Sequence, residues 1–366
     1  MRKIDAKRVV IKVGTNTLCK EDGTLNFSYI DNIARQVSEL DQRGIESIIV
    51  TSGAIGSGSS ELKLGKKQKD ISEKQACAAV GQTTVMLAYQ EAFKRYRKSV
   101  GQVLLTYGAF SARKRYLNLR KTLDKLFEMR VIPIVNENDV ISTDEIEEVF
   151  GDNDKLSALV ASKVDADLLI MLTDVDGLYD RNPRSDEDAR LIHTVDEITK
   201  DIERIAGTRR NMRSIGGMRT KITAAKITMQ SGCYMIIANG RLDNVILRII
   251  NGEELGTLFT PKKRYSNRER WIMFANPRGK ILIDSGAEKA LKEGKSLLPQ
   301  GIEGVERRFK EGDIVRIGNS AKGISNYSSE EISAITLACF NEREKGILKS
   351  SKERVVVTNE NIVILE

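Results

Sequence analysis

Two short clusters of acidic and amide side chains are the residues of this sequence best suited to chemistry on a small ligand. Residues 136–139 (NEND) end an apolar run at residues 131–135, and residues 151–154 (GDND) open a helical stretch. Ligands of open α/β sheets lie beyond the carboxyl ends of the strands and at helix N-termini. Carboxylates and amides gathered there can hold the ammonium, carboxylate and carbonyl groups of a small amino acid. The alternative interpretation is that both clusters are ordinary turn and capping residues.

The composition is that of a globular chain of 366 residues, long enough for two domains. No apolar run approaches the length of a membrane span, and Lys12 interrupts the short apolar segment at residues 9–13, which argues against a signal peptide. The four cysteines, at positions 19, 77, 233 and 339, have no CxxC spacing. We therefore expect neither a disulfide framework nor a zinc site, and we expect a reducing, cytoplasmic location.

The single histidine, His193, lies in a polar stretch, and we expect it at the surface. A Ser-His or Cys-His nucleophile would need this one residue, so the sequence leaves little room for that chemistry. Lys and Arg number 59 against 51 Asp and Glu, which gives a net charge of +8. Such a charge suits an anionic ligand such as a nucleotide and is also compatible with nucleic acid.

Strand-like runs alternate with helical segments up to about residue 260. Apolar runs predict strands at residues 8–13, 47–50, 102–106, 131–135, 167–172 and 234–238. Helical periodicity predicts helices over residues 113–129, 155–163 and 220–230, and a further one that begins at Ser28 with Asp31 as its capping-box acid. This alternation predicts an α/β fold, a three-layer αβα sandwich with a mostly parallel sheet.

The pattern changes after residue 260. Residues 261–275 form a basic, polar stretch typical of a linker, and shorter strand signals follow at residues 280–284, 314–317 and 354–357. We expect a small, mainly β second domain over residues 276–366, joined by this linker to a first domain over residues 1–260. Neither part contains an internal repeat or a low-complexity tract.

Three glycine-containing turns offer sites for a phosphate group. Lys12 and Gly14 end the first strand, Ser52 follows the second, and residues 215–221 (IGGMRTK) precede a helix with Lys221 in its opening turns. Glycine lets backbone N–H groups approach an anion, and helix N-termini stabilise phosphate. Taken singly, each turn has a purely structural explanation as well. The P-loop motif, the dinucleotide motif GxGxxG and the protein-kinase motifs are all absent.

The order of these motifs along the chain resembles that of the amino acid kinase superfamily, and most closely the glutamate 5-kinases. The segments that carry the resemblance are residues 10–15 (VIKVGT), 50–55 (VTSGAI), 134–139 (IVNEND), 150–154 (FGDND), 172–179 (LTDVDGLY) and 216–221 (GGMRTK). The tail, with residues 296–302 (SLLPQGI) and 309–317 (FKEGDIVRI), is similar to the PUA domain attached to many members of that family. Several ordered motifs together are far more specific than any single glycine turn.

The resemblance implies ATP- and Mg²⁺-dependent phosphorylation of the side-chain carboxylate of L-glutamate to L-glutamyl 5-phosphate, the first step of proline biosynthesis. It implies that Lys12 and Lys221 bracket the transferring phosphoryl group with Asp154 as a further catalytic residue, and it assigns no metal ligand. The residues implied to bind glutamate are Ser52, Asn136, Asp139, Asp152 and Asn153. Those implied to bind ATP are Lys12, Gly14, Thr173, Asp174, Ile215, Gly216, Gly217, Met218, Arg219, Thr220 and Lys221.

The implied chemistry is compatible with the composition, because a carboxylate is already a nucleophile and needs no strong general base. The obstacle is the approach of an anion to a polyphosphate. Two lysines, backbone amides and Mg²⁺ can spread that charge in the transition state. Asp139 suits the substrate ammonium, and Asp152 or Asp154 suits the orientation of a lysine or of hydrated Mg²⁺. The sequence does not separate those roles.

The sequence departs from the family pattern in the loop before Lys221. Ile215 and Arg219 stand where relatives commonly have small hydroxyl residues, and residues 209–214 are basic where related loops are often rich in glycine. A lost hydroxyl contact would weaken nucleotide binding, whereas an arginine of this loop (Arg209, Arg210 or Arg213) can reach a phosphate instead.

Three other functions stay open. Another amino acid kinase, acting on acetylglutamate, aspartate, carbamate or UMP, is disfavoured by the tail and by the paired NEND and GDND clusters. An RNA-binding or RNA-modifying role is suggested by the PUA-like tail, although that tail has nearly equal numbers of basic and acidic residues. A non-catalytic amino acid sensor is disfavoured by the two lysines. The resemblance also implies a homodimer or homotetramer, feedback inhibition by proline, and no membrane partner.

Overall fold

The computed structural model describes residues 2, 4–20, 22–64, 70–111, 113–141, 153–181, 183, 186–207, 217–261, 265–344 and 355–365. The chain forms two compact units. Unit 1 consists of Met1–Tyr107 and Leu117–Arg264, and unit 2 consists of Gly108–Tyr116 and Tyr265–Glu366. In the described part of the chain, no helix is both long enough and apolar enough to cross a membrane.

Unit 1 is built around a sheet that has eight strands in the described residues, in the order β3-β4-β2-β1-β5-β7-β8-β6. All neighbouring strands pair in parallel except β7 and β8, which are antiparallel. The strands are β1 (Arg8–Val13), β2 (Glu46–Val50), β3 (Ser99–Leu105), β4 (Val131–Glu137), β5 (Leu168–Thr173), β6 (Thr194–Val195), β7 (Tyr234–Asn239) and β8 (Thr257–Phe259). The predicted, mostly parallel α/β sheet is therefore confirmed.

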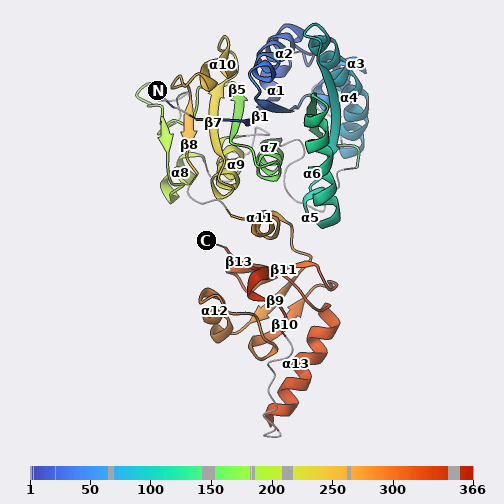
Figure 1. The fold of residues 1–366 in the computed structure, drawn as a ribbon, viewed down its shortest axis with the longest axis vertical. Helices are drawn as coiled ribbons and strands as arrows, with labels where there is room; N and C mark the ends of the chain where they lie inside the picture. Colours follow the sequence, from blue (N-terminus) through green and yellow to red (C-terminus); the bar gives the residue numbers. More distant parts are fainter. Residues whose placement is uncertain are drawn as a thin grey trace. The chain divides into compact units, whose positions relative to one another are not determined.

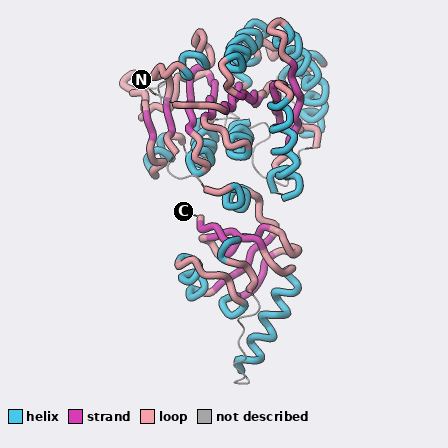
Figure 2. The backbone as a smooth tube through the Cα atoms, viewed as in Figure 1, coloured by secondary structure: helices cyan, strands magenta, loops and turns pink. Residues whose placement is uncertain are grey.

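Helices cover both faces of this sheet, which explains why its central strands are almost continuously apolar. Figure 1 shows α7 and α9 on one face and α2 and α10 on the other, and Figure 2 shows the same three layers by colour. The helices up to residue 250 are α1 (Thr15–Leu18), α2 (Phe27–Gln42), α3 (Ala54–Glu61), α4 (Ile71–Lys94), α5 (Gly108–Ser111), α6 (Arg113–Glu128), α7 (Asn153–Lys163), α8 (Lys200–Ile205), α9 (Met218–Gln230) and α10 (Val245–Ile250). All belong to unit 1 except the short α5 and the start of α6, which belong to unit 2.

The predicted start of the first long helix was wrong. Helix α2 begins at Phe27, and the side chain of Asn26 caps it by accepting a hydrogen bond from the backbone N–H of Tyr29. Asp31 is therefore not a capping-box acid, and it pairs with Arg95 at the far end of α4, at 3.1 Å. Asn competes well with Ser at this position because its short side chain reaches the same orphan N–H.

Two glycines allow α3 and α4 to cross in close contact. A Cβ atom added to Gly58 would lie 1.8 Å from the carbonyl oxygen of Cys77. A Cβ atom added to Gly81 would lie 1.9 Å from the carbonyl oxygen of Ala54. Helix α3 begins directly after the Ser52 turn, so this close crossing also fixes where that turn lies.

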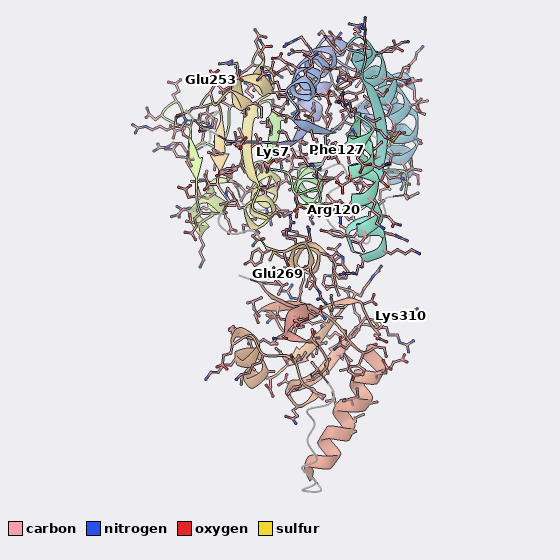
Figure 3. The ribbon with its side chains drawn as sticks, viewed as in Figure 1. Lys7, Arg120, Phe127, Glu253, Glu269 and Lys310 are labelled. Carbon is pink, nitrogen blue, oxygen red and sulfur yellow. The ribbon has the colours of Figure 1, made fainter. Side chains whose placement is uncertain are left out.

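Side chains of α6 contact other elements of unit 1. The guanidinium group of Arg8 lies 4.7 Å from the ring centroid of Phe127, a cation–π contact, and Arg120 pairs with Asp165 at 2.7 Å. Phe127 and Arg120 are labelled in Figure 3. His193 is exposed, as predicted from its polar neighbours. Cys19 and Cys77 are free thiols.

Unit 2 contains a five-stranded sheet in its described residues, in the order β10-β9-β11-β12-β13. Its strands are β9 (Gly279–Ile283), β10 (Ile302–Glu306), β11 (Ile314–Ile317), β12 (Ala321–Ile324) and β13 (Ile362–Ile364), and its helices include α11 (Asn267–Phe274), α12 (Ser285–Lys292) and α13 (Ser329–Glu344). The strand predicted at residues 354–357 was misplaced. Val357 forms only an isolated bridge with Leu297, and the strand that pairs with β12 comes five residues later.

The stretch expected to be a linker contains helix α11. Ser266 and Glu269 form a complete capping box at its N-terminus (Glu269 is labelled in Figure 3), and Trp271 is buried. The Trp271 ring lies 6.5 Å from the ring of Tyr116 and 5.3 Å from the guanidinium carbon of Arg113. The basic, polar composition of this stretch did not indicate a packed helix, because the partners of its buried Trp271 lie about 155 residues earlier in the chain.

Candidate active site

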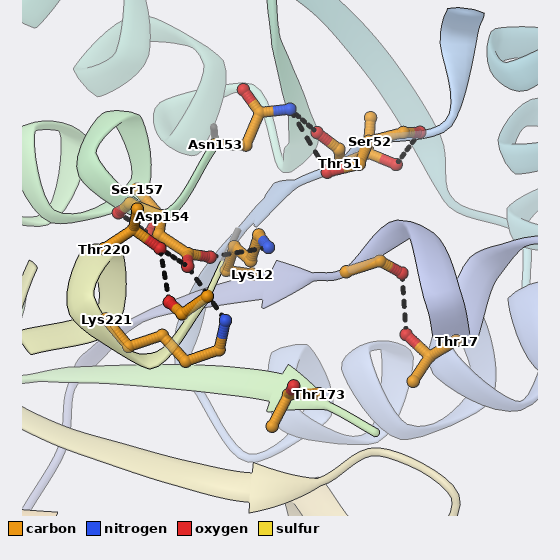
Figure 4. A network of polar contacts seen from close by, with 12 residues as sticks. Lys12, Thr17, Thr51, Ser52, Asn153, Asp154, Ser157, Thr173, Thr220 and Lys221 are labelled. Atoms are coloured by element: carbon orange, nitrogen blue, oxygen red, sulfur yellow. Dashed lines mark hydrogen bonds and ion pairs between the residues drawn. The ribbon is translucent and has the colours of Figure 1, made fainter. Parts of the chain in front are cut away.

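The centre of the site is one carboxylate held between two lysines. Asp154 Oδ1 lies 2.6 Å from Lys12 Nζ, and Asp154 Oδ2 lies 3.0 Å from Lys221 Nζ (Figure 4). The hydroxyl of Thr220 donates a further hydrogen bond to Asp154 Oδ2 at 2.8 Å. The structure thus brings together the three residues predicted to be catalytic.

Three separate elements position this group. Lys12 is the fifth residue of β1, paired with Val50 on one side and Met171 on the other. Asp154 is in the first turn of α7, and Lys221 is the fourth residue of α9. All three lie at the edge of the sheet where the parallel strands end, which is where α/β sheets bind ligands.

The Lys12–Asp154–Lys221 group is buried, with exposed fractions of 7% for Lys12, 0% for Asp154 and 6% for Lys221. Burial by itself raises the pKa of Asp154, but the positive charges of Lys12 and Lys221 outweigh it and lower the pKa to about 2. Asp154 therefore stays ionised at any physiological pH. Two cations and one anion leave the group with a net positive charge, suited to a phosphoryl group.

A network of amide side chains lies beside this group. The Asn153 side chain donates from Nδ2 to the carbonyl oxygen of Thr51 at 2.7 Å and to Ser52 Oγ at 3.2 Å (Figure 4). It also donates to Asn136 Oδ1 at 2.9 Å. The Asn136 side chain in turn donates from Nδ2 to Gln82 Oε1 at 2.7 Å. Asn153 therefore contacts both of the other two predicted substrate residues, Ser52 and Asn136.

Asp139 follows β4 and is 7% exposed. Its burial, and secondarily the negative charge of Glu137, raises its pKa to about 7. Its Oδ1 atom and the Oδ1 atom of Asn153 are buried and lack a hydrogen-bond partner within the described residues. Two unfilled acceptors in a polar site are what a ligand ammonium group would satisfy.

The predicted nucleotide residues at the ends of β1 and β5 also lie together. Gly14 donates its backbone N–H to the carbonyl oxygen of Leu172 at 3.2 Å. Thr173 Oγ1 donates to Asp174 Oδ1, and Asn16 Nδ2 donates to Asp174 Oδ2, each at 3.2 Å. Burial raises the pKa of Asp174, but these two hydrogen bonds and its own backbone N–H lower it overall, so the carboxylate is held ionised.

Helix α9 supplies the other predicted nucleotide residues. Gly217 is its N-cap, Met218 and Arg219 open it, and the first backbone N–H groups of a helix have no partner within the helix. This end of α9 is therefore suited to an anion. The side chain of Arg219 is exposed. The other predicted site residues are Asp152, Ile215 and Gly216, and these, together with the basic loop at residues 209–214, lie outside the described residues.

The described site residues do not form a metal centre by themselves. Within the described part of the chain there is no group of three or more His, Cys, Asp or Glu side chains able to hold a metal ion. Both oxygens of Asp154 are already engaged by lysines. Of the two roles that the sequence left open for Asp154, the geometry therefore supports orientation of the lysines.

Four residues of the site escaped sequence reasoning: Asn16, Thr51, Gln82 and Tyr89. Asn16 orients Asp174, and Thr51 accepts from Asn153. Tyr89 Oη lies 3.0 Å from Thr51 Oγ1, and Gln82 accepts from Asn136. Asn16 and Thr51 lie close in sequence to predicted site residues, and this proximity could have identified them. Gln82 and Tyr89 lie on a helix about 50 residues before the clusters, and nothing local distinguishes them.

The chain is similar to known proteins over nearly its whole length. The amino acid kinase family matches residues 7–239, and the PUA domain family matches residues 279–338. The glutamate 5-kinase of Methanococcoides burtonii is 52% identical over 343 residues, 92% of each chain. Those of Methanosarcina barkeri and a Thermoanaerobacter species are 47% and 48% identical over 99% and 98% of this chain, and 97% and 98% of their own. The crystal structure of a UMP kinase from Bacillus anthracis, 19% identical, has a TM-score of 0.48 and covers 70% of this chain and 97% of that one.

Proposed function

Because the chain belongs to the amino acid kinase family, and within it to the glutamate 5-kinases, we propose that it transfers the terminal phosphoryl group of ATP to the side-chain carboxylate of L-glutamate. The products are L-glutamyl 5-phosphate and ADP, and the reaction is the first step of proline biosynthesis. Relatives of this similarity over nearly the whole chain favour a kinase over an RNA-binding role for the protein.

The observation that carries the proposal is the buried group formed by Lys12, Asp154 and Lys221. In the reaction a γ-carboxylate oxygen of glutamate attacks the terminal phosphorus, the bond from that phosphorus to the β,γ-bridging oxygen breaks, and ADP leaves with the electron pair. No proton has to be removed from the nucleophile. The catalytic problem is one of charge, since negative charge spreads over the phosphoryl oxygens in the transition state.

Two lysines from distant parts of the chain stabilise that negative charge. An ammonium group has three N–H donors, so it can hold Asp154 and a phosphoryl oxygen at the same time. Asp154 keeps Lys12 and Lys221 at fixed positions before ATP arrives, which is the pre-organisation that makes electrostatic catalysis effective. In this proposal Asp154 is a positioning residue for the two catalytic lysines.

Glutamate binds in the amide network. Asp139 and Asn153 have unfilled acceptor oxygens for the substrate ammonium, and Ser52 and Asn136 hold Asn153 in place. With a pKa of about 7, Asp139 is only partly ionised in the free protein at neutral pH, and the positive charge of a bound ammonium group lowers that pKa and favours the carboxylate.

ATP occupies the adjoining edge, over Gly14, Thr173 and Asp174 and against the N-terminus of α9. The proposed roles of Ile215 and Gly216 in ATP binding and of Asp152 in glutamate binding rest on the family resemblance alone. Mg²⁺ enters with ATP, because it is commonly held by substrate phosphates and only one or two carboxylates. With both Asp154 oxygens engaged, no part of the proposed mechanism depends on a protein cage for the ion.

The domain assignment follows the same family resemblance. We propose a kinase domain over residues 1–260, a connection over residues 261–275 and a PUA domain over residues 276–366, the connection containing helix α11. We further propose a cytoplasmic homo-oligomer, dimer or tetramer, that proline inhibits.

A coupled assay of ADP release across candidate acceptors tests the proposal. L-Glutamate should support turnover, whereas L-aspartate, N-acetylglutamate, carbamate and UMP should not. Aspartate is shorter by one C–C bond, roughly 1.5 Å, and a misplacement of about that size costs on the order of 100-fold in rate. Equal turnover with aspartate, or faster turnover with another acceptor, would contradict the substrate assignment.

A further inference from the structure

One face of helix α4 reaches the substrate network at two points. Gln82 Oε1 accepts from Asn136 Nδ2 at 2.7 Å, and Tyr89 Oη lies 3.0 Å from Thr51 Oγ1. Residues seven apart lie on the same face of a helix, so both contacts come from a single stripe of α4. Gln82 and Tyr89 therefore support the two neighbouring strand ends from which Asn136 and Thr51 come.

The orientation of every amide in this network is determined, starting from a backbone carbonyl. The Thr51 carbonyl can only accept, so Asn153 must present its NH₂ group to it, at 2.7 Å. That NH₂ group also donates to Asn136 Oδ1 at 2.9 Å, and the backbone N–H of Glu137 donates to the same oxygen at 2.9 Å. Asn136 must then present its own NH₂ group to Gln82, and Gln82 must present its oxygen.

The consequence is a spare donor at Gln82. Its Nε2 atom is buried and has no hydrogen-bond partner within the described residues. The network thus contains an unfilled donor on Gln82 together with unfilled acceptors on Asn153 and Asp139. A zwitterionic amino acid is complementary to such a set, because its ammonium group donates and its α-carboxylate accepts.

We propose that Gln82 is a further substrate-binding residue, whose Nε2 donates a hydrogen bond to the α-carboxylate of the amino acid substrate. This inference rests on the proposed function. The γ-carboxylate must lie beside Lys12 and Lys221 to be phosphorylated. Gln82 is separated from Asp154 by two amides, Asn153 and Asn136, so it contacts the opposite end of the substrate.

The variant Gln82→Glu isolates the donor. It preserves the length of the side chain and the oxygen that accepts from Asn136, and it replaces the NH₂ group by an anionic oxygen that repels a carboxylate. We expect the KM for L-glutamate to rise by about 10- to 100-fold, the range of one hydrogen bond to a charged group, with the KM for ATP unchanged. Gln90→Glu is the matched control, since Gln90 is exposed on the same helix and the change adds the same charge.

A substrate without the α-carboxylate separates binding from structural support. 4-Aminobutyrate has the ammonium and the reacting carboxylate of glutamate but no α-carboxylate. The preference for L-glutamate over 4-aminobutyrate, measured as the ratio of the two kcat/KM values, should fall by about 10- to 100-fold in Gln82→Glu. A purely structural role would lower both kcat/KM values equally and leave the ratio unchanged, which would overturn the proposal.

Ligand-induced thermal stabilisation gives a second readout that does not require turnover. L-Glutamate should raise the melting temperature of the wild-type protein more than 4-aminobutyrate does, and the difference should shrink in Gln82→Glu and in the neutral variant Gln82→Met. An unchanged difference in both variants would reject the role of Gln82. A wild-type protein that binds glutamate without phosphorylating it would contradict the proposed function. The melting-temperature difference would then still test whether Gln82 binds the α-carboxylate.

Discussion

Asp154 illustrates how much of this site depends on single residues. One carboxylate, fully buried, contacts two lysines that are 209 positions apart in the chain, Lys12 and Lys221. Unpaired buried ions are costly, whereas an anion placed between two cations compensates most of that cost. The arrangement keeps both lysines in place in the absence of substrate.

The first prediction concerns those lysines. Lys12→Ala or Lys221→Ala should lower kcat by on the order of 100- to 1,000-fold, the effect of one pre-organised donor in a transition state. The KM for glutamate should change far less, because the lost interaction is made mainly in the transition state. Steady-state kinetics with both substrates measures the two effects separately.

Lys226→Ala is the matched control for Lys221→Ala. Lys226 lies on the same helix, is exposed and pairs with the equally exposed Glu203, so its removal should leave kcat unchanged. A near-normal kcat in either Lys12→Ala or Lys221→Ala would remove that lysine from the mechanism.

The second prediction follows from the pKa of about 7 at Asp139. Below pH 7 the free protein holds Asp139 protonated, and a neutral carboxyl group binds an ammonium group poorly. The KM for glutamate should therefore fall by about tenfold per pH unit as the pH rises toward 7, and level off above it. Asp139→Asn should weaken glutamate binding at high pH and remove the bend near pH 7, while ATP binding survives.

The raised pKa of Asp139 also affects the free energy of unfolding, and here a rise in pH is unfavourable. The folded-state pKa of Asp139 lies above its ordinary value of 3.8, so between pH 4 and pH 7 the folded protein binds more protons than the unfolded one. The contribution of Asp139 to the free energy of unfolding thus decreases as the pH rises through this window. Melting curves of the ligand-free wild type and Asp139→Asn should converge at low pH and separate above pH 7, with the variant the more stable.

At the scale of elements, the crossing of α3 and α4 shapes the turn that carries Ser52. Gly58 and Gly81 leave no room for a Cβ atom, since each would overlap a backbone carbonyl of the facing helix. Gly56 lies on α3 as well, but a Cβ atom there would meet nothing within 4 Å. Substitutions at these three positions therefore distinguish the effect of helix propensity from the effect of helix packing.

The third prediction uses that contrast. Gly58→Ala or Gly81→Ala should lower the free energy of unfolding by ~3 kcal/mol, the upper part of the range for overpacking, and should raise the KM for glutamate by moving the Ser52 turn. Gly56→Ala should raise the free energy of unfolding by up to ~1 kcal/mol, because alanine replaces glycine in a helix interior without a clash. Chemical denaturation measures all three. Stabilisation by Gly58→Ala would show that the helices do not cross as closely as described.

At the scale of the whole molecule, each unit has its own buried cluster. In unit 1 the cluster includes side chains of β1, β5, α2 and α4, and in unit 2 it includes those of β9, β11 and α12 together with Ile332 and Phe309. The described residues of the proposed active site all lie in unit 1, before residue 222.

The fourth prediction is that a chain ending before Tyr265 folds and retains measurable phosphorylation of glutamate. Its weak point is the segment Gly108–Tyr116, which belongs to unit 2 and would lose Trp271 as a partner for Tyr116 and Arg113. Tyr116→Ser in the truncated chain should therefore improve its solubility without changing kcat. A truncated chain that is folded and soluble but inactive would show that the tail contributes to catalysis.

Much of the fold could be read from the sequence because its signals are local. Runs such as VVIKV and LLIML specify buried parallel strands, and the structure confirms them within one or two residues as β1 and β5. The incorrect predictions of secondary structure also arose from local signals. Asn26 replaced Ser28 as a helix cap, the last strand of unit 2 was placed too early, and helix α11 was hidden by its polar composition.

Some features of the candidate site also follow from local sequence, whereas others depend on long-range contacts. The sequence by itself determined which residue types end the strands and open the helices, and the order of its motifs identified Lys12, Asp139, Asn153 and Lys221. Only the tertiary structure decided that Asp154 bonds both lysines and that Asp139 has a raised pKa. It also decided that Gln82, from a helix about 50 residues away in sequence, completes the amide network. The physical reason is that hydrogen bonds and charge shifts depend on distances of a few ångströms between elements, and those distances exist only after the elements have packed.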